Sequence, residues 1–330
     1  MRAARGLVCG VFSPPHAGHQ LVVDFARKLA DEVTIALIVT PDGLIDAELR
    51  QSWLSEMFPS NPIVQCTIDE PEVDAAKLAA SLPEGSRFGM VFGSDPFDAE
   101  LAKALNAQYV AVDPERANVG VSGAAIRDEV ISNWEFLPAC VRPQYVQRIC
   151  VFGPTGSGKS SLVEQLAIHY DTVGTFEYRE SFIAQAGREP NLDEMAFVAA
   201  AQLASEDAMA RQANRVLFCD SNASALALEA EIRHNESSSE TWALARERHY
   251  TLHLLMDVDG DWAMGMGRKP SAKAAKQFER YRQFLIESDL KYLRLDGDYD
   301  TRFRIACDAV DNITGQPTGR PPRPEYLRSA

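Results

Sequence analysis

Two glycine-rich turns, each at the exit of an apolar strand-like run and ahead of a helix-like run, constrain this chain most strongly. The first covers residues 10–19, at the exit of a strand expected at 6–12, and the second covers 153–160, after a strand expected at 148–152. A strand, a turn and a helix in succession are the building unit of a parallel β-sheet with crossover helices. The sequence therefore predicts two parallel-sheet α/β domains in series.

The length agrees with two domains. A chain of 330 residues is large for one domain and comfortable for two of about 150 residues each. We place the boundary near Arg142 and Pro143, which gives domains over residues 1–145 and 146–314 and a proline- and glycine-rich tail over 315–330. Because no internal repeat is present, we expect two different folds.

Strand and helix signals alternate through both halves. In the first half we expect strands at 6–12, 33–39, 63–68, 88–92 and 109–112, and helices at 17–29, 46–57, 73–82, 96–105 and from Ser122 onward. In the second half we expect strands at 148–152, 216–220, 249–256 and 292–295, helices at 159–169, 178–186, 192–213, 272–288 and 299–312, and a helical region after the strand at 216–220.

Charge and cysteine usage exclude several classes of protein. The formal net charge of -14 opposes general binding of nucleic acid, so phosphate ligands must be held locally. The six cysteines are scattered without a CxxC pair, which fits a reducing compartment. The chain start lacks a signal-peptide pattern, and no apolar run is long enough to cross a bilayer. We expect a cytoplasmic protein that binds neither membrane nor nucleic acid, and the sequence leaves a homo-oligomer open.

The first turn carries an HxGH pattern. His16, Gly18 and His19 stand where a helix begins, and the amino end of a helix offers unpaired N–H groups and a partial positive charge. Imidazoles placed there can donate hydrogen bonds to phosphate oxygens and stabilise charge on a departing pyrophosphate. Two ordinary histidines at a helix start are the alternative, but Gly10 and Phe12 in the preceding strand favour a functional site.

The second turn matches the Walker A pattern completely. Its backbone N–H groups cradle a β-phosphate, Lys159 reaches the β/γ oxygens, and the Ser160 hydroxyl is a ligand for Mg²⁺. Asp220 ends an apolar strand, where a second Mg²⁺ ligand is expected, although a helix cap is the alternative. The residues expected to bind ATP here are Gly153, Gly156, Ser157, Gly158, Lys159, Ser160 and Ser161.

The first half resembles the HxGH nucleotidyltransferase superfamily, and the whole chain resembles NadR-type bifunctional proteins. Those proteins join an NMN adenylyltransferase to a ribosylnicotinamide kinase. The narrower resemblance is carried by the segments 91–97, 112–116, 121–127 and 134–143. It implies a Rossmann-like nucleotidyltransferase domain followed by a P-loop domain similar to nucleoside kinases, both using ATP and Mg²⁺.

The resemblance also implies roles for residues of the first domain. His16 and His19 would hold the β/γ side of ATP, Arg127 its phosphates and Asp95 its ribose. Ala124 stands where the family has Thr, so one hydroxyl contact is missing, which costs roughly 0.5–1.5 kcal/mol. Further nucleotide contacts are expected from Gly10, Phe12, Gly18, Gly93 and Ser122, and contacts to the mononucleotide from Arg50, Trp53 and Trp134. A solvated helix charge (Arg50) and core tryptophans are the alternatives.

In the second domain, the resemblance leaves the catalytic base open between Glu177 and Glu180. Both could also be ordinary acids at a helix start. Asp257 and Trp262 match an Asp–Trp stretch at the acceptor site, and Arg268 matches a lid arginine over ATP. The acidic pair expected between them has become Met and Gly, which points to an altered acceptor or a weak kinase.

The expected function is salvage of pyridine nucleotides: nicotinamide riboside is phosphorylated to NMN, and NMN is adenylylated to NAD. Three alternatives stay open. The P-loop domain could be a regulatory ATP sensor, both domains could serve another acceptor, or the chain could regulate transcription. Some NadR-type proteins carry a DNA-binding helix-turn-helix ahead of these domains. Only five residues precede Gly6, so we expect no such module here.

Overall fold

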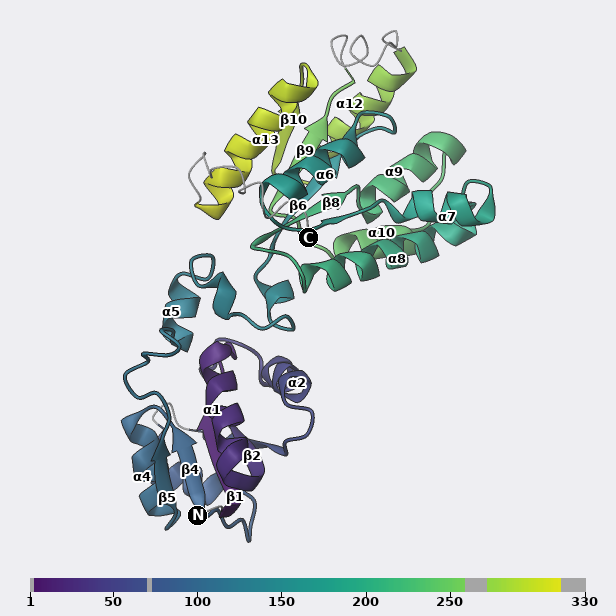
Figure 1. The fold of residues 1–330 in the computed structure, drawn as a ribbon. Coiled ribbons are helices and arrows are strands. Elements are labelled where there is room, and N and C mark those ends of the chain that lie inside the picture. Colours follow the sequence, from purple (N-terminus) through teal and green to yellow (C-terminus); the bar gives the residue numbers. More distant parts are fainter. Residues whose placement is uncertain (1–2, 70–72, 259–271, 316–330) are drawn as a thin grey trace. The chain divides into compact units, whose positions relative to one another are not determined.

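The computed structural model describes residues 3–69, 73–258 and 272–315. The chain divides into two compact units, Met1–Arg142 and Pro143–Ala330 (Figure 1). The division falls where a short 3-10 helix, η2 (Arg142–Gln144), begins. Among the described residues, no helix has both the length and the apolar character needed to cross a bilayer.

The first domain contains a five-stranded parallel sheet in the order β3-β2-β1-β4-β5. The central strand β1 pairs with β2 on one side and with β4 on the other. The strands are β1 (Ala3–Gly10), β2 (Ala30–Val39), β3 (Ile63–Thr67), β4 (Met90–Gly93) and β5 (Gln108–Ala111). The helices are α1 (Ala17–Leu29), α2 (Ala47–Met57), α3 (Ala75–Ser81), α4 (Pro96–Ala104), α5 (Gly123–Asp128) and the 3-10 helix η1 (Trp134–Phe136).

The alternation of side chains along β1 builds two separate cores. Val8 packs with α1 residues such as Val23 and Ala26 on one face, and Leu7 packs with Leu78 of α3 and Leu101 of α4 on the other. Since the strand order reverses between β1 and β4, the helices that follow these two strands leave toward opposite faces. A crevice therefore opens at the carboxyl ends of β1 and β4, where ligands bind in doubly wound sheets.

The second domain repeats the principle with a different strand order. Its parallel sheet runs β10-β9-β6-β8-β7, with the Walker A strand β6 at the centre. The strands are β6 (Gln147–Phe152), β7 (Gly174–Thr175), β8 (Val216–Asp220), β9 (Leu252–Met256) and β10 (Tyr292–Leu295). The helices are α6 (Lys159–His169), α7 (Tyr178–Ala186), α8 (Leu192–Ala210), α9 (Ala223–His234), α10 (Ser239–Arg246), α12 (Ala272–Glu287) and α13 (Tyr299–Thr314).

The two faces of this sheet are covered by different helices. Ile149 and Val151 of β6 pack against α6 and α13. Phe152 points to the opposite face, where its ring lies 5.0 Å from that of Tyr281 in α12. Figure 1 shows α6 and α13 on one side and α8 and α10 on the other. This sandwich of helices around β6 fixes the place of the glycine loop at its end.

The sequence pattern missed one strand and misjudged several element ends. β7 has only two residues, too few to show periodicity, yet Gly174 and Thr175 pair with β8. Helix α8 ends at Ala210 rather than at 213, and β9 begins at Leu252 rather than at 249. The helical region after Asp220 forms two helices, α9 and α10.

We expect the substitution Gly93→Ala to destabilise the first domain. A Cβ atom at residue 93 would lie 1.9 Å from Asp98 Oδ2, which also accepts a hydrogen bond from the Asp95 N–H. Overpacking of this kind costs about 1–3 kcal/mol of unfolding free energy. Urea denaturation measures the change in unfolding free energy. Hydrogen exchange tests whether the loss of stability lies in β1 and β4. Gly120→Ala is the matched control, because its new Cβ meets nothing closer than 3.8 Å; equal stabilities of the two variants would contradict this prediction.

Candidate active sites

A cavity of about 460 Å³ lies at the carboxyl ends of β1 and β4 in the first domain. It is lined by the HxGH segment on one side and by the loops after β4 and β5 and the start of α5 on the other. The structure thus brings together residues that are more than a hundred positions apart in sequence. The residues expected to bind ATP that line the cavity are Gly10, Phe12, His16, Gly18, His19, Asp95, Ser122 and Arg127.

The two histidines at the start of α1 hold each other in one orientation. His16 is the N-cap, and its Nδ1 accepts a hydrogen bond from the Gly18 N–H at 3.1 Å. The Nδ1 of His19 accepts from the His16 N–H at 3.1 Å, and the two ring centroids lie 3.8 Å apart. Because both Nδ1 atoms accept, each neutral ring carries its proton on Nε2. Both side chains therefore present N–H donors for a ligand oxygen.

These rings are held in their neutral form. Burial, together with the nearby Arg116 guanidinium, lowers the pKa of His16 to about 4. Burial, the His16 ring and Arg116 lower the pKa of His19 as well. Because both folded pKa values lie below 6.5, protonation favours the unfolded chain, and the histidines reduce stability as the pH falls below about 6.5. A bound polyphosphate would reverse this effect by favouring the imidazolium.

The opposite wall contains two arginines. Arg127 donates to the backbone carbonyl of Ser13, which ties α5 to the strand exit. Arg116 donates to the Val121 carbonyl at 3.1 Å and pairs with Asp95 at 2.9 Å. The Asp95 carboxylate, expected to bind a ribose, is thus engaged with Arg116. Ser122 is the N-cap of α5, and its hydroxyl accepts from the Ala125 N–H.

No sequence motif assigns a role to Arg116. The loop that carries it is held by Asp113, whose carboxylate accepts hydrogen bonds from the backbone of Asn118 and Val119. Both Asp113 and Arg116 adopt positive φ angles, of 50° and 53°. The segment 112–116 carries part of the family resemblance, but its sequence gives Arg116 no role. The loop conformation brings Arg116 close enough to the histidines for its charge to lower their pKa values.

Cys9 also lines this cavity and faces a buried carboxylate. Its thiol donates to Asp98 Oδ1 at 3.4 Å. Burial and the Asp98 charge raise the pKa of Cys9 well above its usual range. Asp98 in turn accepts from the Asp95 N–H at the start of α4, so this pair supports the strand exit at Gly93.

Three residues expected on the mononucleotide side are buried and lie outside the lining of this cavity. Arg50 is only 1% exposed, and its guanidinium donates to the backbone carbonyls of Val11 and Ile38 at 2.6 and 3.0 Å. It is therefore neither a solvated charge nor one of the cavity residues, but a buried tie between β2 and the exit of β1. Trp53 and Trp134 are buried as well, and neither is among the residues that line the cavity. A core role explains both.

The Walker A loop of the second domain follows β6 directly. Gly153, Gly156 and Gly158 have φ angles of 142°, 81° and 93°, which residues that carry a side chain rarely adopt. Gly158 is the N-cap of α6, and a glycine has no side chain to bind the first N–H groups of the helix. Those N–H groups are therefore available to a phosphate. Lys159 is buried and donates to the Pro154 carbonyl at 3.4 Å.

Asp220 and Ser160 fit the role of magnesium ligands. Asp220 is 1% exposed at the end of β8, and its Oδ1 has no hydrogen-bond partner among the described residues. Burial raises its pKa, while a hydrogen bond with Ser160 and the charge of Lys159 act in the opposite direction. The helix cap that could have explained Asp220 is supplied instead by Asn222, which accepts from the Ala225 N–H. An acidic oxygen left without a partner beside a hydroxyl suits a divalent cation.

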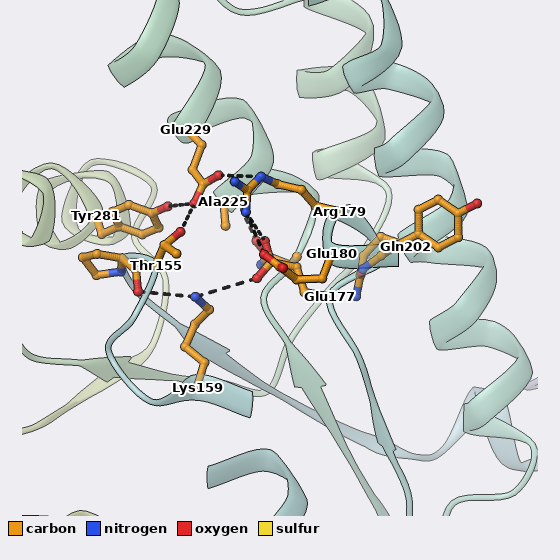
Figure 2. Close-up of polar contacts among 12 residues, drawn as sticks. Thr155, Lys159, Glu177, Arg179, Glu180, Gln202, Ala225, Glu229 and Tyr281 are labelled. Carbon is orange, nitrogen blue, oxygen red and sulfur yellow. Dashed lines mark hydrogen bonds and ion pairs between the residues drawn. The ribbon is translucent and has the colours of Figure 1, made fainter. Parts of the chain in front are cut away.

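The two glutamates that are candidates for the catalytic base, Glu177 and Glu180, have different surroundings in the structure. Glu177 is 8% exposed, and its Oε2 lies 3.8 Å from Lys159 Nζ (Figure 2). Burial raises the pKa of Glu177 to about 7, opposed by the charges of Lys159 and Arg179. Glu180 has a side chain that is 62% exposed and pairs with Arg179. Only Glu177 therefore combines burial with contact to the Walker A lysine.

A glutamine from the long helix α8 supports the start of α7. Gln202 Oε1 accepts the Tyr178 N–H at 2.8 Å, directly after Glu177. Its amide lies 3.5 Å from Glu206, which is fully buried and accepts from Tyr250 at 2.9 Å. Sequence reasoning missed Gln202 because it reads as an ordinary helix residue 24 positions away from its partner.

Two of the remaining predicted residues, Asp257 and Ser161, have partners of their own. Asp257 is buried at the end of β9 and pairs with Arg294, so its carboxylate is already engaged. Ser161 lies in the first turn of α6, and its carbonyl accepts from Tyr299 at 2.9 Å. Trp262 and Arg268 lie outside the described residues.

Comparisons with known proteins agree with these two halves. Residues 7–127 match a family described as cytidylyltransferase-like, and residues 148–302 match an AAA domain family. With the two sheets and sites described above, these matches define the class: a nucleotidyltransferase-like domain followed by a P-loop domain similar to kinases.

The chain is homologous to NadR over almost its whole length. It is 26% identical to the trifunctional NAD biosynthesis/regulator proteins NadR of Salmonella typhimurium and Escherichia coli, over 94% of this chain and 83% of each relative. Two crystal structures of NadR, one with NAD and AMP-PNP and one with NR, share the fold with TM-scores of 0.75 and 0.77. They are 20% and 19% identical, and each match covers 96% of this chain and 98% of the other.

We expect the pKa of His16 to rise when an anion enters the first cavity. Proton NMR should show a value of about 4 without ligand and a marked upward shift with inorganic pyrophosphate, since the anion stabilises the imidazolium. His253, whose pKa is also lowered to about 4 by burial, lies in β9 of the other domain and is the internal control. A His16 titration that pyrophosphate does not move would contradict an anion site here.

Proposed function

We propose that this protein makes NAD in two ATP-dependent steps. The second domain phosphorylates nicotinamide riboside to NMN, and the first transfers the adenylyl group of ATP to NMN. The observation that carries the proposal is the presence on one chain of a histidine-lined cavity and a Walker A loop beside a buried glutamate. Homology with NadR over 94% of the chain supports both assignments.

In the adenylyl transfer, an oxygen of the NMN phosphate attacks the α-phosphorus of ATP. The bond from the α-phosphorus to the bridging oxygen breaks, and pyrophosphate leaves. The Nε2–H groups of His16 and His19 donate to the departing phosphates, and the Arg127 and Arg116 guanidinium groups balance their charge. No covalent intermediate with the protein is required, so the site acts by position and charge.

In the kinase step, the 5′-hydroxyl of the riboside attacks the γ-phosphorus of ATP, and ADP leaves. Glu177 accepts the hydroxyl proton, since it is buried beside Lys159 and its pKa lies near neutrality. Lys159 and the N–H groups at the start of α6 hold the phosphates. Ser160 and Asp220 would hold Mg²⁺, which when bound neutralises charge on the β- and γ-phosphates.

We place both reactions in the cytoplasm. The six cysteines are unpaired, and five of them (Cys66, Cys140, Cys150, Cys219 and Cys307) are buried in the cores, as expected for a reducing compartment. The substrates are the small molecules ATP, NMN and nicotinamide riboside.

Product analysis tests the two-step proposal directly. Purified protein with Mg-ATP and nicotinamide riboside should form NAD, with NMN as the intermediate. Chromatography of samples taken over time measures both products. Lys159→Ala should abolish phosphorylation of the riboside yet leave NAD formation from added NMN intact. His19→Ala should do the reverse and accumulate NMN. A wild-type protein that leaves the riboside unchanged would overturn the kinase assignment, and failure to adenylylate NMN would overturn the transferase assignment.

The kinase step should weaken as the pH falls below about 7. Glu177 must be a carboxylate to accept a proton, and its pKa of about 7 leaves it half protonated near neutrality. The kcat/KM for the riboside should therefore rise with pH through this range. Glu177→Gln should reduce kcat by about a hundredfold or more, while Glu180→Gln, the exposed neighbour, should have a much smaller effect. Equal losses in the two variants would refute the choice of Glu177.

A further inference from the structure

A second buried glutamate faces the kinase site from a helix with no recognised motif. Glu229 of α9 is 8% exposed and stands in an otherwise apolar stretch, between Leu228 and Ala230. Figure 2 shows its carboxylate directed toward the Walker A loop and the start of α7. Burying a carboxylate is costly unless other groups compensate its charge and donate hydrogen bonds to it. An apolar residue would fit this position at lower cost, so the partners of Glu229 need an explanation.

Those partners come from three other elements around the site. The Thr155 hydroxyl, inside the Walker A loop, donates to Glu229 Oε1 at 3.0 Å. The Tyr281 hydroxyl of α12 donates to the same oxygen at 3.4 Å. Arg179 Nε of α7 lies 3.3 Å from Oε2, and Arg233 of α9 lies 3.7 Å from it. One carboxylate thus joins the nucleotide loop to two helices that are distant in sequence.

Arg179 extends this connection to the proposed base. Its guanidinium lies between the two buried carboxylates, 3.3 Å from Glu229 and 3.7 Å from Glu177 Oε1. It also pairs with Glu189 and with the exposed Glu180. Glu177 in turn contacts Lys159 at 3.8 Å. A continuous path therefore runs from Thr155 through Glu229 and Arg179 to Glu177, and back to the Walker A loop at Lys159 (Figure 2).

We propose that Glu229 is a positioning residue of the kinase site, which holds the Walker A loop in register with the helix that carries Glu177. This inference rests on the proposed kinase function. The Thr155 hydroxyl donates a hydrogen bond to Glu229, whereas a Walker A loop binds phosphates through its backbone N–H groups. The contact therefore serves the alignment of loop and base more than the binding of ATP. Without the Glu229 carboxylate, Glu177 would be the one buried carboxylate of the pair left beside the Arg179 guanidinium, which would compete for the oxygen that must accept the substrate proton.

Substitutions on both sides of this contact test the role. Thr155→Val removes the hydroxyl at nearly constant volume, and Glu229→Gln removes the charge while keeping an oxygen that can accept from Thr155 and Tyr281. Each should lower kcat for the riboside by about ten- to a hundredfold, the size expected when a hydrogen bond or ion pair to a buried charged group is lost. The dissociation constant for ATP, measured by titration calorimetry, should change by less than about threefold. Glu231→Gln, on the same helix but paired with Arg280, should leave kcat unchanged.

The double variant and the conservative variant separate positioning from a folding defect. Because Thr155 and Glu229 act through one contact, Thr155→Val and Glu229→Gln together should cost no more than the larger single effect. Thr155→Ser keeps the hydroxyl and should recover most of the kcat that Thr155→Val loses. Additive losses, a loss of ATP affinity that matches the loss of kcat, or no recovery with serine would each overturn the role of Glu229. A wild-type protein that does not phosphorylate the riboside overturns the kinase assignment, and this role with it.

Discussion

Both sites depend on glycines near the exits of the central strands, where neighbouring atoms leave no room for a side chain. At Gly153 a Cβ atom would come within 2.9 Å of the Met256 carbonyl of the neighbouring strand. At Gly18 it would meet the His16 ring at 2.9 Å. Neither position leaves room for a side chain. The first N–H groups of α6 have no side-chain cap, whereas the Gly18 N–H of α1 is bound by His16, so at the start of α1 the Nε2–H groups of His16 and His19 remain as donors. Both candidate phosphate sites in the described part of the chain lie at these two helix starts.

The electrostatics of the two sites differ although both are built to bind polyphosphates on an acidic protein. The first cavity relies on neutral imidazoles, whose donor atoms are fixed by backbone hydrogen bonds, with Arg116 and Arg127 on the facing wall. The second uses permanent cations, Lys159 and Arg179, each compensated by buried carboxylates. Neutral donors avoid the cost of burying charge before the ligand arrives. Cations that are paired with carboxylates keep their charge, and they can exchange these partners for a ligand phosphate when the ligand binds.

The sequence predicted those parts of the molecule that depend on local pattern. The strand–turn–helix units at 10–19 and 153–160 required no distant information, and α1, α6 and β10 have the ends that periodicity indicated. What it could not predict rests on contacts between distant segments. Glu229 is 74 residues from Thr155, and Arg50 lies 39 residues from the carbonyl that it binds. Residue type alone left Arg50 between a mononucleotide contact and a solvated charge, and it did not distinguish Glu177 from Glu180. Burial separates these alternatives, and burial is set by the packed fold.

The thiol in the first cavity has a consequence for the chemistry that this site tolerates. The reactive form of cysteine is the thiolate, and Cys9 is held as the thiol by burial and by the carboxylate of Asp98 beside it. Oxidants and alkylating agents that reach the cavity therefore meet a poor nucleophile. Although Cys9 lines the cavity, we therefore expect the cavity to be insensitive to the thiol–disulfide balance of its surroundings.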